Sequence, residues 1–449
     1  MYPDPFKERL YKQLGEEAYQ SFLNALQEIT PTSIRINTKK LDFSPKLEKI
    51  AWCDNGYYLP ERPLFAADPL WHAGAYYVQE ASSMSLEKAF NKIKSIQQTP
   101  LCVLDLCAAP GGKSTHITSL LSENDLLVSN EVIHARVNIL MENLNKWGYP
   151  NVIITSSDSK DFGELGEIFD IVVVDAPCSG EGLFRKDISA IEQWNEDNVR
   201  TCELRQNRIL NEISKCVKPN GFIVYSTCTY NPGENEQQIE MLINQGFEPI
   251  AFELNGETKF SHQFMPHIHK GEGFFIALLQ KKDSFQQGDS KKNTKELKKE
   301  KYQADYAKLV STENYMIKHK DEIKAISPHV FEFYNLNLGH LQTYQIGTSI
   351  GHLSGSLLLP SDKLVFSQIF NPTVFDSLDL SYEESLSYLG KQVIPKVSSQ
   401  KGYVVLKYNH INIGLGKFAG NRINNLYPNE WKLRKQISQS DYFCMLKFK

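Results

Sequence analysis

Between Leu101 and about Lys282, short apolar runs alternate with longer amphipathic stretches. Several of the apolar runs, including 169–174 and 221–225, are nearly unbroken. Strands that are covered on both faces have this composition, whereas half-exposed strands alternate between apolar and polar residues. Because strands and helices follow one another in turn, the pattern predicts an α/β fold with a parallel, doubly wound sheet.

The spacing of these runs places the individual elements. The expected strands are 101–106, 126–130, 152–155, 169–175, 221–227, 247–253 and 274–280, and the expected helices lie near 114–122, 133–147, 196–217 and 232–245. The last helix is preceded by Asn231 and Pro232, and Glu234 is expected to reach back to its first turn, as in a capping box.

The flanking regions differ from this central part. An N-terminal region to about residue 95 shows helical patterning over Phe6–Gln27 and a short strand at Ser33–Asn37. A lysine-rich segment near 281–301 marks a boundary. Beyond it we expect a helical stretch at about 303–325 and then a small β-barrel that includes 402–408 and 411–416. The expected divisions are therefore 1–95, 96–282, 283–302 and 303–449.

Composition narrows the class of protein. The 449 residues are 41% hydrophobic and 23% charged, as is usual for soluble globular proteins. Because there is neither a long apolar stretch nor an apolar N-terminal segment, we expect a cytoplasmic protein without a membrane partner. Charge is uneven: residues 281–449 carry 24 Lys and Arg against 16 Asp and Glu, whereas the preceding part is acidic. Such a basic region either contacts a polyanion or is a solvated tail.

Two of the eight cysteines follow predicted strands directly. Cys178 lies in Asp175–Gly180, and Cys228 lies in Ser226–Tyr230. In an open α/β sheet, ligands bind outside the carboxyl ends of the strands. The two thiols and the carboxylate of Asp175 therefore indicate covalent chemistry at that edge. No cysteine pair has the spacing of a zinc motif, and no metal is expected. His262, His267 and His269 are interpreted as part of an exposed, metal-free loop.

A glycine-containing turn between the first strand and its helix predicts a cofactor site. The sequence of the turn fits neither G-x-x-x-x-G-K-[ST] nor G-x-G-x-x-G. Glu131 ends the second strand, where an acid can accept hydrogen bonds from ribose hydroxyls. Asp158, after the third strand, is placed to meet an adenine amino group; alternatively, each acid only caps a helix. Together they indicate an S-adenosylmethionine pocket formed by Cys107, Ala108, Ala109, Pro110, Gly111, Gly112, Lys113, Glu131, Asp158 and Asp175.

Three segments, 105–114, 175–180 and 226–230, resemble motifs of the Nol/Nop/Sun family of RNA cytosine-C5 methyltransferases. The resemblance extends to 31–37, 76–84 and 182–187. It implies a class I, Rossmann-like methyltransferase domain with an N-terminal α/β extension that binds RNA, and S-adenosylmethionine as methyl donor. Spacing alone does not show which thiol attacks the base. The resemblance assigns the attack on C6 to Cys228, the stabilisation of the ring to Asp175 and the release of product to Cys178, with Lys113 ordering the pocket.

The C-terminal part resembles the PUA-like end of the bacterial branch that modifies small-subunit (16S) ribosomal RNA. Residues 416–425, with Lys432, Arg434 and Lys435, are expected to contact RNA. The resemblance therefore implies ribosomal RNA or the 30S subunit as partner of a monomeric enzyme. Three alternatives stay open: a tRNA methyltransferase, a ribosome-assembly factor that binds RNA without turnover, and a thiol redox protein with a Cys178–Cys228 disulfide. A DNA cytosine methyltransferase is disfavoured.

Overall fold

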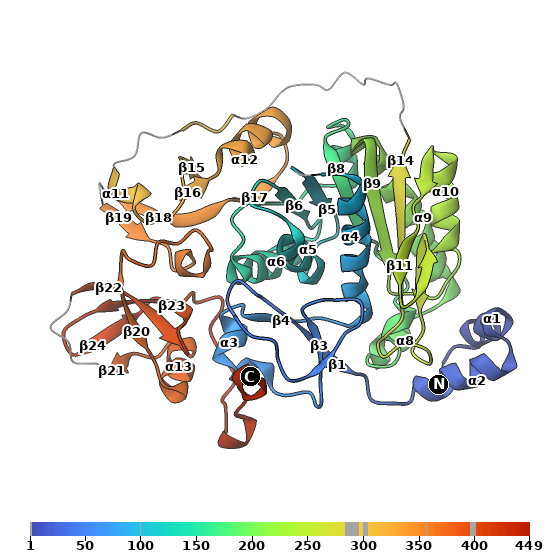
Figure 1. Ribbon diagram of the computed structural model, residues 1–449, viewed down its shortest axis with the longest axis horizontal. Helices are drawn as coiled ribbons and strands as arrows, with labels where there is room; N and C mark the ends of the chain where they lie inside the picture. Colours follow the sequence, from blue (N-terminus) through green and yellow to red (C-terminus); the bar gives the residue numbers. More distant parts are fainter. Residues whose placement is uncertain (1, 99, 283–295, 300–303, 356, 396–400) are drawn as a thin grey trace.

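The computed structural model describes all residues except 1, 99, 283–295, 300–303, 356 and 396–400. At its centre is a nine-stranded sheet with the order β10-β14-β9-β8-β5-β6-β7-β17, in which β13 also pairs with β14 (Figure 1). Its parallel strands are β5 (Cys102–Asp105), β6 (Leu126–Asn130), β7 (Val152–Thr155), β8 (Phe169–Asp175) and β9 (Val217–Thr227).

Antiparallel strands complete both edges of this sheet, so that it is mixed rather than wholly parallel. They are β10 (Phe247–Pro249), β13 (Ser261–Phe264), β14 (Phe274–Lys281) and β17 (Thr343–Ile346). The strand expected at 247–253 is two strands. β10 ends at Pro249, which has no N–H to donate to a ladder, and β11 (Phe252–Leu254) pairs with β12 (Glu257–Lys259).

Helices cover the two faces of the sheet, which confirms the doubly wound α/β prediction. Alternate residues of β8 point to opposite sides: Val172 and Val174 pack in the cluster that contains α9 and α10, and Ile171 and Val173 pack in the cluster that contains α4, α5 and α6. The helices of this part of the chain are α4 (Leu86–Ile96), α5 (Gly112–Leu120), α6 (His134–Trp147), α7 (Ser159–Gly163), α8 (Ile188–Gln193), α9 (Glu196–Ile213) and α10 (Glu236–Asn244). Of these, α8 has no buried residue and does not pack on the sheet.

The start of α10 differs from the prediction. The helix begins at Glu236, and its N-cap Asn235 makes no side-chain cap hydrogen bond. Glu234 does not close a capping box, because its carboxylate accepts hydrogen bonds from Ser179. Glu234, which the sequence pattern assigns to a helix cap, instead connects the segment before α10 to Ser179.

The N-terminal region contains two helices and a separate sheet. The helix expected over 6–27 is interrupted at Gly15, whose φ of 74° is favourable only for glycine. The sheet has the order β2-β3-β1-β4. The elements are α1 (Asp4–Leu14), α2 (Glu16–Ala25), β1 (Thr32–Ile36), β2 (Glu48–Lys49), β3 (Gly56–Leu59), α3 (Pro69–His72) and β4 (Tyr76–Val78).

The helical stretch expected at 303–325 is wrong for most of its length. Helix α11 (Ala304–Ala307) is short, and a hairpin of β15 (Tyr315–His319) and β16 (Glu322–Ile326) follows it. Lys320 turns the hairpin with a φ of 56°, an uncommon conformation for lysine that its sequence does not signal. This hairpin continues into β18 (Thr348–Ser354) and β19 (Leu357–Pro360), and α12 (Pro328–Phe333) follows β16.

The expected C-terminal β structure is present as a five-stranded sheet with the order β20-β22-β23-β24-β21. Its elements are β20 (Asp376–Asp379), α13 (Tyr382–Leu389), β21 (Ile394–Pro395), β22 (Gly402–Tyr408), β23 (Ile411–Phe418) and β24 (Arg422–Asn425). Of the proposed linker 283–302, only 296–299 lie among the described residues; the rest of that prediction lies outside them.

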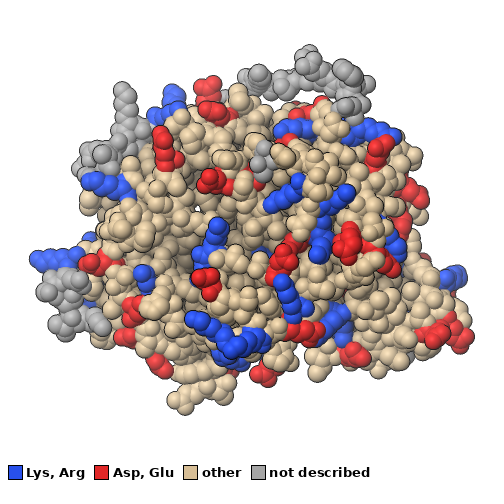
Figure 2. Space-filling model, in the orientation of Figure 1, with Lys and Arg blue, Asp and Glu red and all other residues tan. Residues whose placement is uncertain are grey.

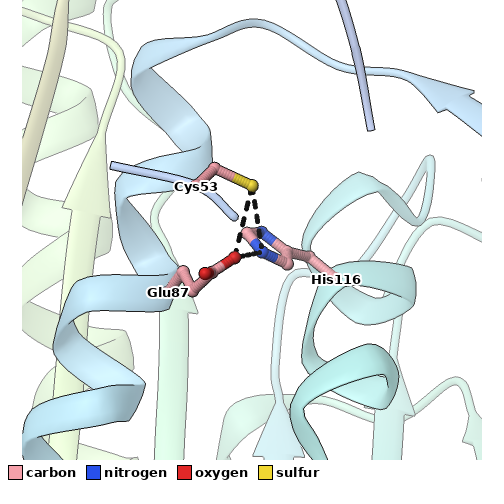
Figure 3. Close-up of side chains that lie close together, drawn as sticks. All are labelled: Cys53, Glu87 and His116. Atoms are coloured by element: carbon pink, nitrogen blue, oxygen red, sulfur yellow. Dashed lines mark hydrogen bonds and ion pairs between the residues drawn. The ribbon is translucent and has the colours of Figure 1, made fainter. Parts of the chain in front are cut away.

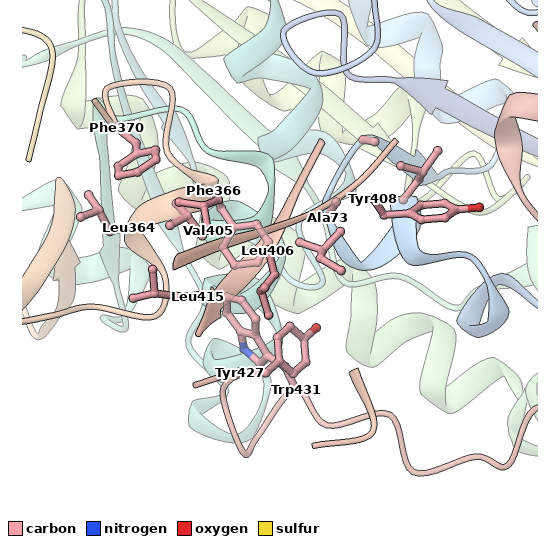
Figure 4. Packing of buried hydrophobic residues seen from close by; sticks show 14 of the residues in the cluster. Ala73, Leu364, Phe366, Phe370, Val405, Leu406, Tyr408, Leu415, Tyr427 and Trp431 are labelled. Atoms are coloured by element: carbon pink, nitrogen blue, oxygen red, sulfur yellow. The ribbon is translucent and has the colours of Figure 1, made fainter. Parts of the chain in front are cut away.

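One apolar core joins the C-terminal sheet to the N-terminal region. Buried residues of β22 and β23 and the aromatic rings of Tyr427 and Trp431 belong to the same cluster as Ala73 of the N-terminal region (Figure 4). Contacts between the backbone and side chains reinforce this junction: Tyr382 donates to Ala67 O (2.6 Å), and Met445 N–H donates to Asp68 (2.8 Å). No helix in the described part of the chain is long and apolar enough to cross a membrane.

Candidate active site

A pocket of about 350 Å³ opens at the carboxyl ends of β5, β8 and β9. Three groups of residues line it: the glycine-containing turn after β5, the ends of β8 and β9, and segments of the N-terminal region and of the loop before β14. They include Cys107, Ala108, Ala109, Pro110, Gly112, Lys113, Asp175, Cys228, Tyr77, Gln79, Glu80, Lys186, Glu272 and Phe274. The structure thus brings most of the predicted site residues to one cavity.

The turn after β5 exposes its backbone to this pocket. Gly111 is the N-cap of α5 and has a φ of 110°, which a side chain would strain. Ala108 N–H donates to Asn130 O (2.8 Å), and this bond attaches the turn to the end of β6. Ser114 donates to one oxygen of the buried Asp105 (2.6 Å), and Asp105 Oδ1 has no hydrogen-bond partner among the described residues.

Glu131 lies at the end of β6 with its carboxylate buried. One oxygen accepts from Ile133 N–H (2.9 Å). The other, Oε2, lies 3.3 Å from Arg136 but makes no hydrogen bond with any described residue. Arg136 also donates to Ala109 O (2.5 Å) and so connects Glu131 to the glycine-containing turn. A buried acceptor of this kind normally has a hydrogen-bond donor, and a ribose hydroxyl could be that donor.

Asp158 lies outside this pocket, at the start of α7. Its carboxylate caps that helix in a capping box with Asp161, and it pairs with Arg208 at 2.9 Å. It lines a neighbouring hollow of about 380 Å³ with Val132 and His134. The hydrogen bonds of a helix cap therefore occupy this carboxylate, and its contact with an adenine ring stays a prediction.

Lys113 and Asp175 form an ion pair inside the pocket. Lys113 Nζ lies 2.7 Å from Asp175 Oδ2, and Ser226 donates to Asp175 Oδ1 (2.9 Å). Burial lowers the pKa of Lys113, but the charge and hydrogen bond of Asp175, together with the charge of Asp105, oppose burial and the net shift of the pKa is upward. Lys113 therefore stays positively charged beside the carboxylate. The side chain of Asp175 is 35% exposed, which leaves it accessible from the pocket.

The two strand-end thiols lie side by side. Cys178 Sγ and Cys228 Sγ are 3.2 Å apart, and Cys228 N–H donates to Cys178 Sγ (3.3 Å). The hydrogen bond to Cys228 and then burial raise the pKa of Cys178 well above its usual value. The Cys178 thiol therefore stays protonated and can donate a hydrogen bond to Cys228 Sγ. Of the two, Cys228 lines the pocket, where a substrate could reach it.

Close packing holds the backbone of Cys228 in place. Gly182 N–H donates to Cys228 O (2.8 Å). A Cβ at position 182 would lie 2.4 Å from Gly273 O, so only glycine fits there. This contact lies within the segment 182–187 that the sequence comparison with the Nol/Nop/Sun family included.

A buried network that sequence reasoning missed fixes the Cys178 loop. Glu234 accepts from Ser179 N–H (2.8 Å), from Ser179 Oγ and from Gln206 Nε2 (3.0 Å). Gln206 also donates to Pro177 O (3.0 Å). The residues on both sides of Cys178 are therefore tied to α9 and to the segment before α10. The sequence places Glu234 shortly after the strand-end motif 226–230 but does not signal this role, which appears only in its contacts.

A second missed group is the buried cluster of Cys53, Glu87 and His116 (Figure 3). Cys53 donates to Glu87 (3.2 Å), and His116 Nε2 lies 3.0 Å from the same carboxylate oxygen. Asp54 N–H donates to the other oxygen (3.0 Å). Hydrogen bonds within the cluster thus pair the thiol and the carboxylate, and they connect the loop before β3 to α4 and α5.

The exposed loop expected for the three histidines near residue 265 is present only in part, because His267 and His269 lie half-buried in the loop after β13 whereas His262 lies on the strand. His262 is buried on β13, and its Nε2 lies 3.2 Å from Phe252 O. Met265 N–H donates to His269 (3.2 Å). Burial lowers the pKa of all three imidazoles, which favours their neutral forms. They contribute to packing beside β14.

Each main region of the chain is similar to known proteins. A family model for the 16S rRNA methyltransferase RsmB/F matches residues 95–280, one for the N-terminal domain of 16S rRNA methyltransferase RsmF matches 2–81, and one for the methyltransferase RsmF PUA domain matches 375–433. Ribosomal RNA small subunit methyltransferase F of Vibrio atlanticus is 32% identical, over 91% of this chain and 93% of its own. The Escherichia coli protein of the same name is 28% identical over 96% of each chain.

Solved structures show the same fold. A methyltransferase homologue from Pyrococcus horikoshii is 26% identical and superimposes with a TM-score of 0.52, over 62% of this chain and 95% of its own. NSun6 from the same organism is 19% identical, with a TM-score of 0.52 over 63% of this chain and 99% of its own. These similarities confirm the predicted methyltransferase fold of the central sheet.

Proposed function

We propose that this chain, which belongs to the family of ribosomal RNA small subunit methyltransferase F, methylates C5 of a cytosine in 16S ribosomal RNA through a covalent adduct at Cys228. One observation carries the proposal: the Cys228 thiol, the Lys113–Asp175 ion pair and the glycine-containing turn line a single pocket. The pocket therefore offers a nucleophile, a charged partner for the ring and a backbone site for a cofactor.

The residues present fit S-adenosylmethionine as the methyl donor. The backbone from Cys107 to Gly112 would face its amino-acid end, and the buried Glu131 Oε2 would accept from a ribose hydroxyl. When bound, the cofactor supplies an electrophilic methyl group. Arg208 and the α7 cap would compete with an adenine amino group for the carboxylate of Asp158.

Cytosine C5 is a weak nucleophile until a thiolate adds to C6. In the proposed first step, Cys228 Sγ forms a bond to C6, and the electron pair of the C5–C6 double bond becomes available at C5. Charge then develops toward N3, where Asp175 would hold or supply a proton. Lys113, paired with Asp175, keeps that carboxylate in position.

Cys178 would act after methyl transfer. The proton on C5 must leave, and its electron pair re-forms the C5–C6 double bond while the Cys228–C6 bond breaks. Cys178 Sγ, 3.2 Å from Cys228 Sγ, lies close to these atoms. The resemblance allows it to act as the base or as a group that positions water. Because its raised pKa keeps the thiol protonated, we propose that it positions a water molecule, which takes the C5 proton. The Cys228 thiol is then free for the next turnover.

Ribosomal RNA is favoured as substrate because the whole chain, including the PUA-domain match at 375–433, aligns with enzymes named for small-subunit ribosomal RNA. The proposed reaction therefore takes place in the cytoplasm. A tRNA methyltransferase would use the same catalytic groups. A non-catalytic assembly factor would not need a reactive thiol that opens into the cofactor pocket.

Transfer of labelled methyl from S-adenosylmethionine to 16S ribosomal RNA tests the proposal. The RNA is taken from cells that lack the enzyme, and bisulfite sequencing locates the product. We expect 5-methylcytosine with the wild-type chain and none with Cys228→Ala. Cys216→Ala, a change at a buried thiol remote from the pocket, serves as the matched control and should retain activity. Methylation of tRNA alone, or activity in Cys228→Ala, would contradict the proposal.

A further inference from the structure

A second hollow, of about 1240 Å³, lies directly beside the candidate active site. It is called the flanking groove below. Its walls come from three distant parts of the chain: residues 29–33, 46–48 and 58–62 of the N-terminal region, Lys186 and Lys270 of the central region, and Phe448 at the C-terminal end. The groove shares Val78, Gln79, Glu80, Lys186 and Glu272 with the active-site pocket.

We propose that the flanking groove binds the single-stranded RNA next to the target cytosine, with Lys46 and Arg62 as its phosphate contacts. This inference rests on the proposed function, since it names where the same substrate lies. A cytosine must leave a base-paired stack before a thiol can reach C6. The nucleotides on either side of it then need a surface that continues from the pocket, and the shared residues make the flanking groove that continuation.

Lys46 and Arg62 are the two cations of the groove that have no acidic partner among the residues that the structure describes and could therefore pair with phosphates. Both side chains are exposed, and no carboxylate oxygen of a described residue lies within 4 Å of either cation. The other two lysines have partners: Lys186 pairs with Glu272 at 2.7 Å, and Lys270 pairs with Glu48. Ion pairs of this kind bring no net charge to a phosphate.

The acidic groups of the groove are mostly engaged as well. Three backbone N–H groups, those of Ser82, Ser83 and Glu272, donate to the carboxylate of Glu80 at 2.9 Å each. Glu61 is exposed and precedes Arg62 in the sequence, and among the acids of the groove in the described part of the chain it alone has no ion pair or side-chain hydrogen bond. Figure 2 shows Lys and Arg side chains gathered around the C-terminal end, with acidic side chains beside them.

The ring of Phe448 gives the groove an aromatic surface on which a base can stack, whereas the Tyr58 ring is buried, with Lys270 Nζ 4.5 Å from its centre. Tyr58 lies in its wall, where its hydroxyl donates to Lys270 O, and Phe448 is half-buried at the other side. Lys46 N–H donates to Phe448 O (2.7 Å), so the C-terminal end is fixed beside one of the proposed phosphate contacts. Cations next to rigid aromatic rings are the combination that single-stranded nucleic acids recognise.

The test compares the double variant Lys46→Ala/Arg62→Ala with wild type in the full-length chain. The control is Lys94→Ala, which removes an exposed cation at the end of α4 that leads into β5, at the opposite edge of the sheet. The probe is a fluorescein-labelled, single-stranded RNA oligonucleotide, and its binding is measured by anisotropy over a range of salt concentrations. Methylation of 16S ribosomal RNA is measured in parallel.

We expect the double variant to bind the oligonucleotide about 10-fold more weakly near physiological salt, and the slope of log K against log salt to fall by about 1.4, as for two lost phosphate contacts. KM for RNA should rise while kcat and cofactor affinity stay unchanged, and Lys94→Ala should match wild type. Unchanged binding and unchanged salt dependence in the double variant would overturn the inference. So would RNA crosslinks from 4-thiouridine that avoid 46–62 and Phe448, as expected if a protein occupies the groove.

These outcomes separate this inference from the proposed function. If wild type forms 5-methylcytosine but the double variant is normal in every RNA assay, the groove assignment fails and the enzyme assignment stands. If wild type forms no 5-methylcytosine on any RNA yet the double variant loses binding, the groove is supported and the proposed reaction fails.

Discussion

At the scale of single residues, the environments of the two strand-end thiols distinguish them. Cys228 lines the pocket beside the Lys113–Asp175 pair, whereas Cys178 lies behind it with a raised pKa and its sulfur against Cys228. A thiol that stays protonated is a poor nucleophile but a good hydrogen-bond donor to a neighbouring thiolate. This asymmetry supports the assignment of attack to Cys228, which the spacing of the sequence could not decide.

His116 makes the stability of the chain depend on pH. Burial and the Arg35 guanidinium lower the pKa of His116 to about 4, although Glu87 opposes them. The unfolded chain, with an ordinary histidine pKa, binds a proton below about pH 6.5, while the folded chain does not. Stability is therefore lost as pH falls from about 6.5 to 4, by about 2 kcal/mol between pH 7 and pH 5 from this residue.

Urea denaturation of His116→Gln at pH 7 and pH 5 measures this effect. Glutamine can still donate to Glu87 but does not titrate, so the variant should lose about 2 kcal/mol less than wild type over that interval. His410→Gln, a change at an exposed histidine, is the control and should keep the wild-type difference. An equal pH dependence in wild type and His116→Gln would contradict the buried, neutral imidazole.

At the scale of elements, the position of the Cys178 loop depends on α9 and on the segment before α10. Glu234 holds Ser179 through two hydrogen bonds, and Gln206 of α9 holds Pro177. Because the proposed role of Cys178 comes after methyl transfer, a looser loop should slow the release of product more than the formation of the adduct. Glu234 is thus a positioning residue rather than a group that contacts substrate.

We expect Glu234→Gln to lower turnover about 10-fold, as for the loss of one hydrogen bond to a charged group, about 1.5 kcal/mol. Covalent enzyme–RNA complex should accumulate at the same time, which a merely destabilised protein would not show. Denaturing gels and single-turnover kinetics measure both effects. Glu240→Gln, at an exposed position of α10, is the control. A lower turnover without accumulated complex would contradict the positioning role.

The sequence predicts those elements whose pattern lies within the element itself, and it does not predict those that depend on contacts with distant residues. Four of the five parallel strands agree with the prediction to within one residue, because buried apolar runs between turns are a local signal, and β9 begins four residues before the expected 221. The hairpin at 315–326 was not predicted, because its turn at Lys320 has no glycine or asparagine to mark it. The sequence around Glu234 is typical of a helix cap. Its actual role depends on a contact with Ser179, which is distant in the sequence and gives no local signal.

At the scale of the whole molecule, the parts of the chain are interleaved. Strand β17 of the C-terminal region extends the central sheet beside β7, and the C-terminal sheet shares its core with the N-terminal region. The flanking groove depends on this arrangement, since Lys46, Lys186 and Phe448 meet there from three regions. Sequence motifs predict catalytic groups, most of which the fold brings to one pocket, but contacts between such distant segments have no sequence signal. The divisions at 95, 282 and 302 stay predictions.

In the proposed reaction, Cys228 attacks the base and Cys178 assists its release. The most direct measurement is the amount of RNA that stays attached to the protein on a denaturing gel, with S-adenosylmethionine and 16S ribosomal RNA present. Cys178→Ala should accumulate a covalent complex, wild type should show little, and Cys228→Ala and the double variant Cys178→Ala/Cys228→Ala should show none. A complex that forms without Cys228, or normal turnover without Cys178, would contradict the account.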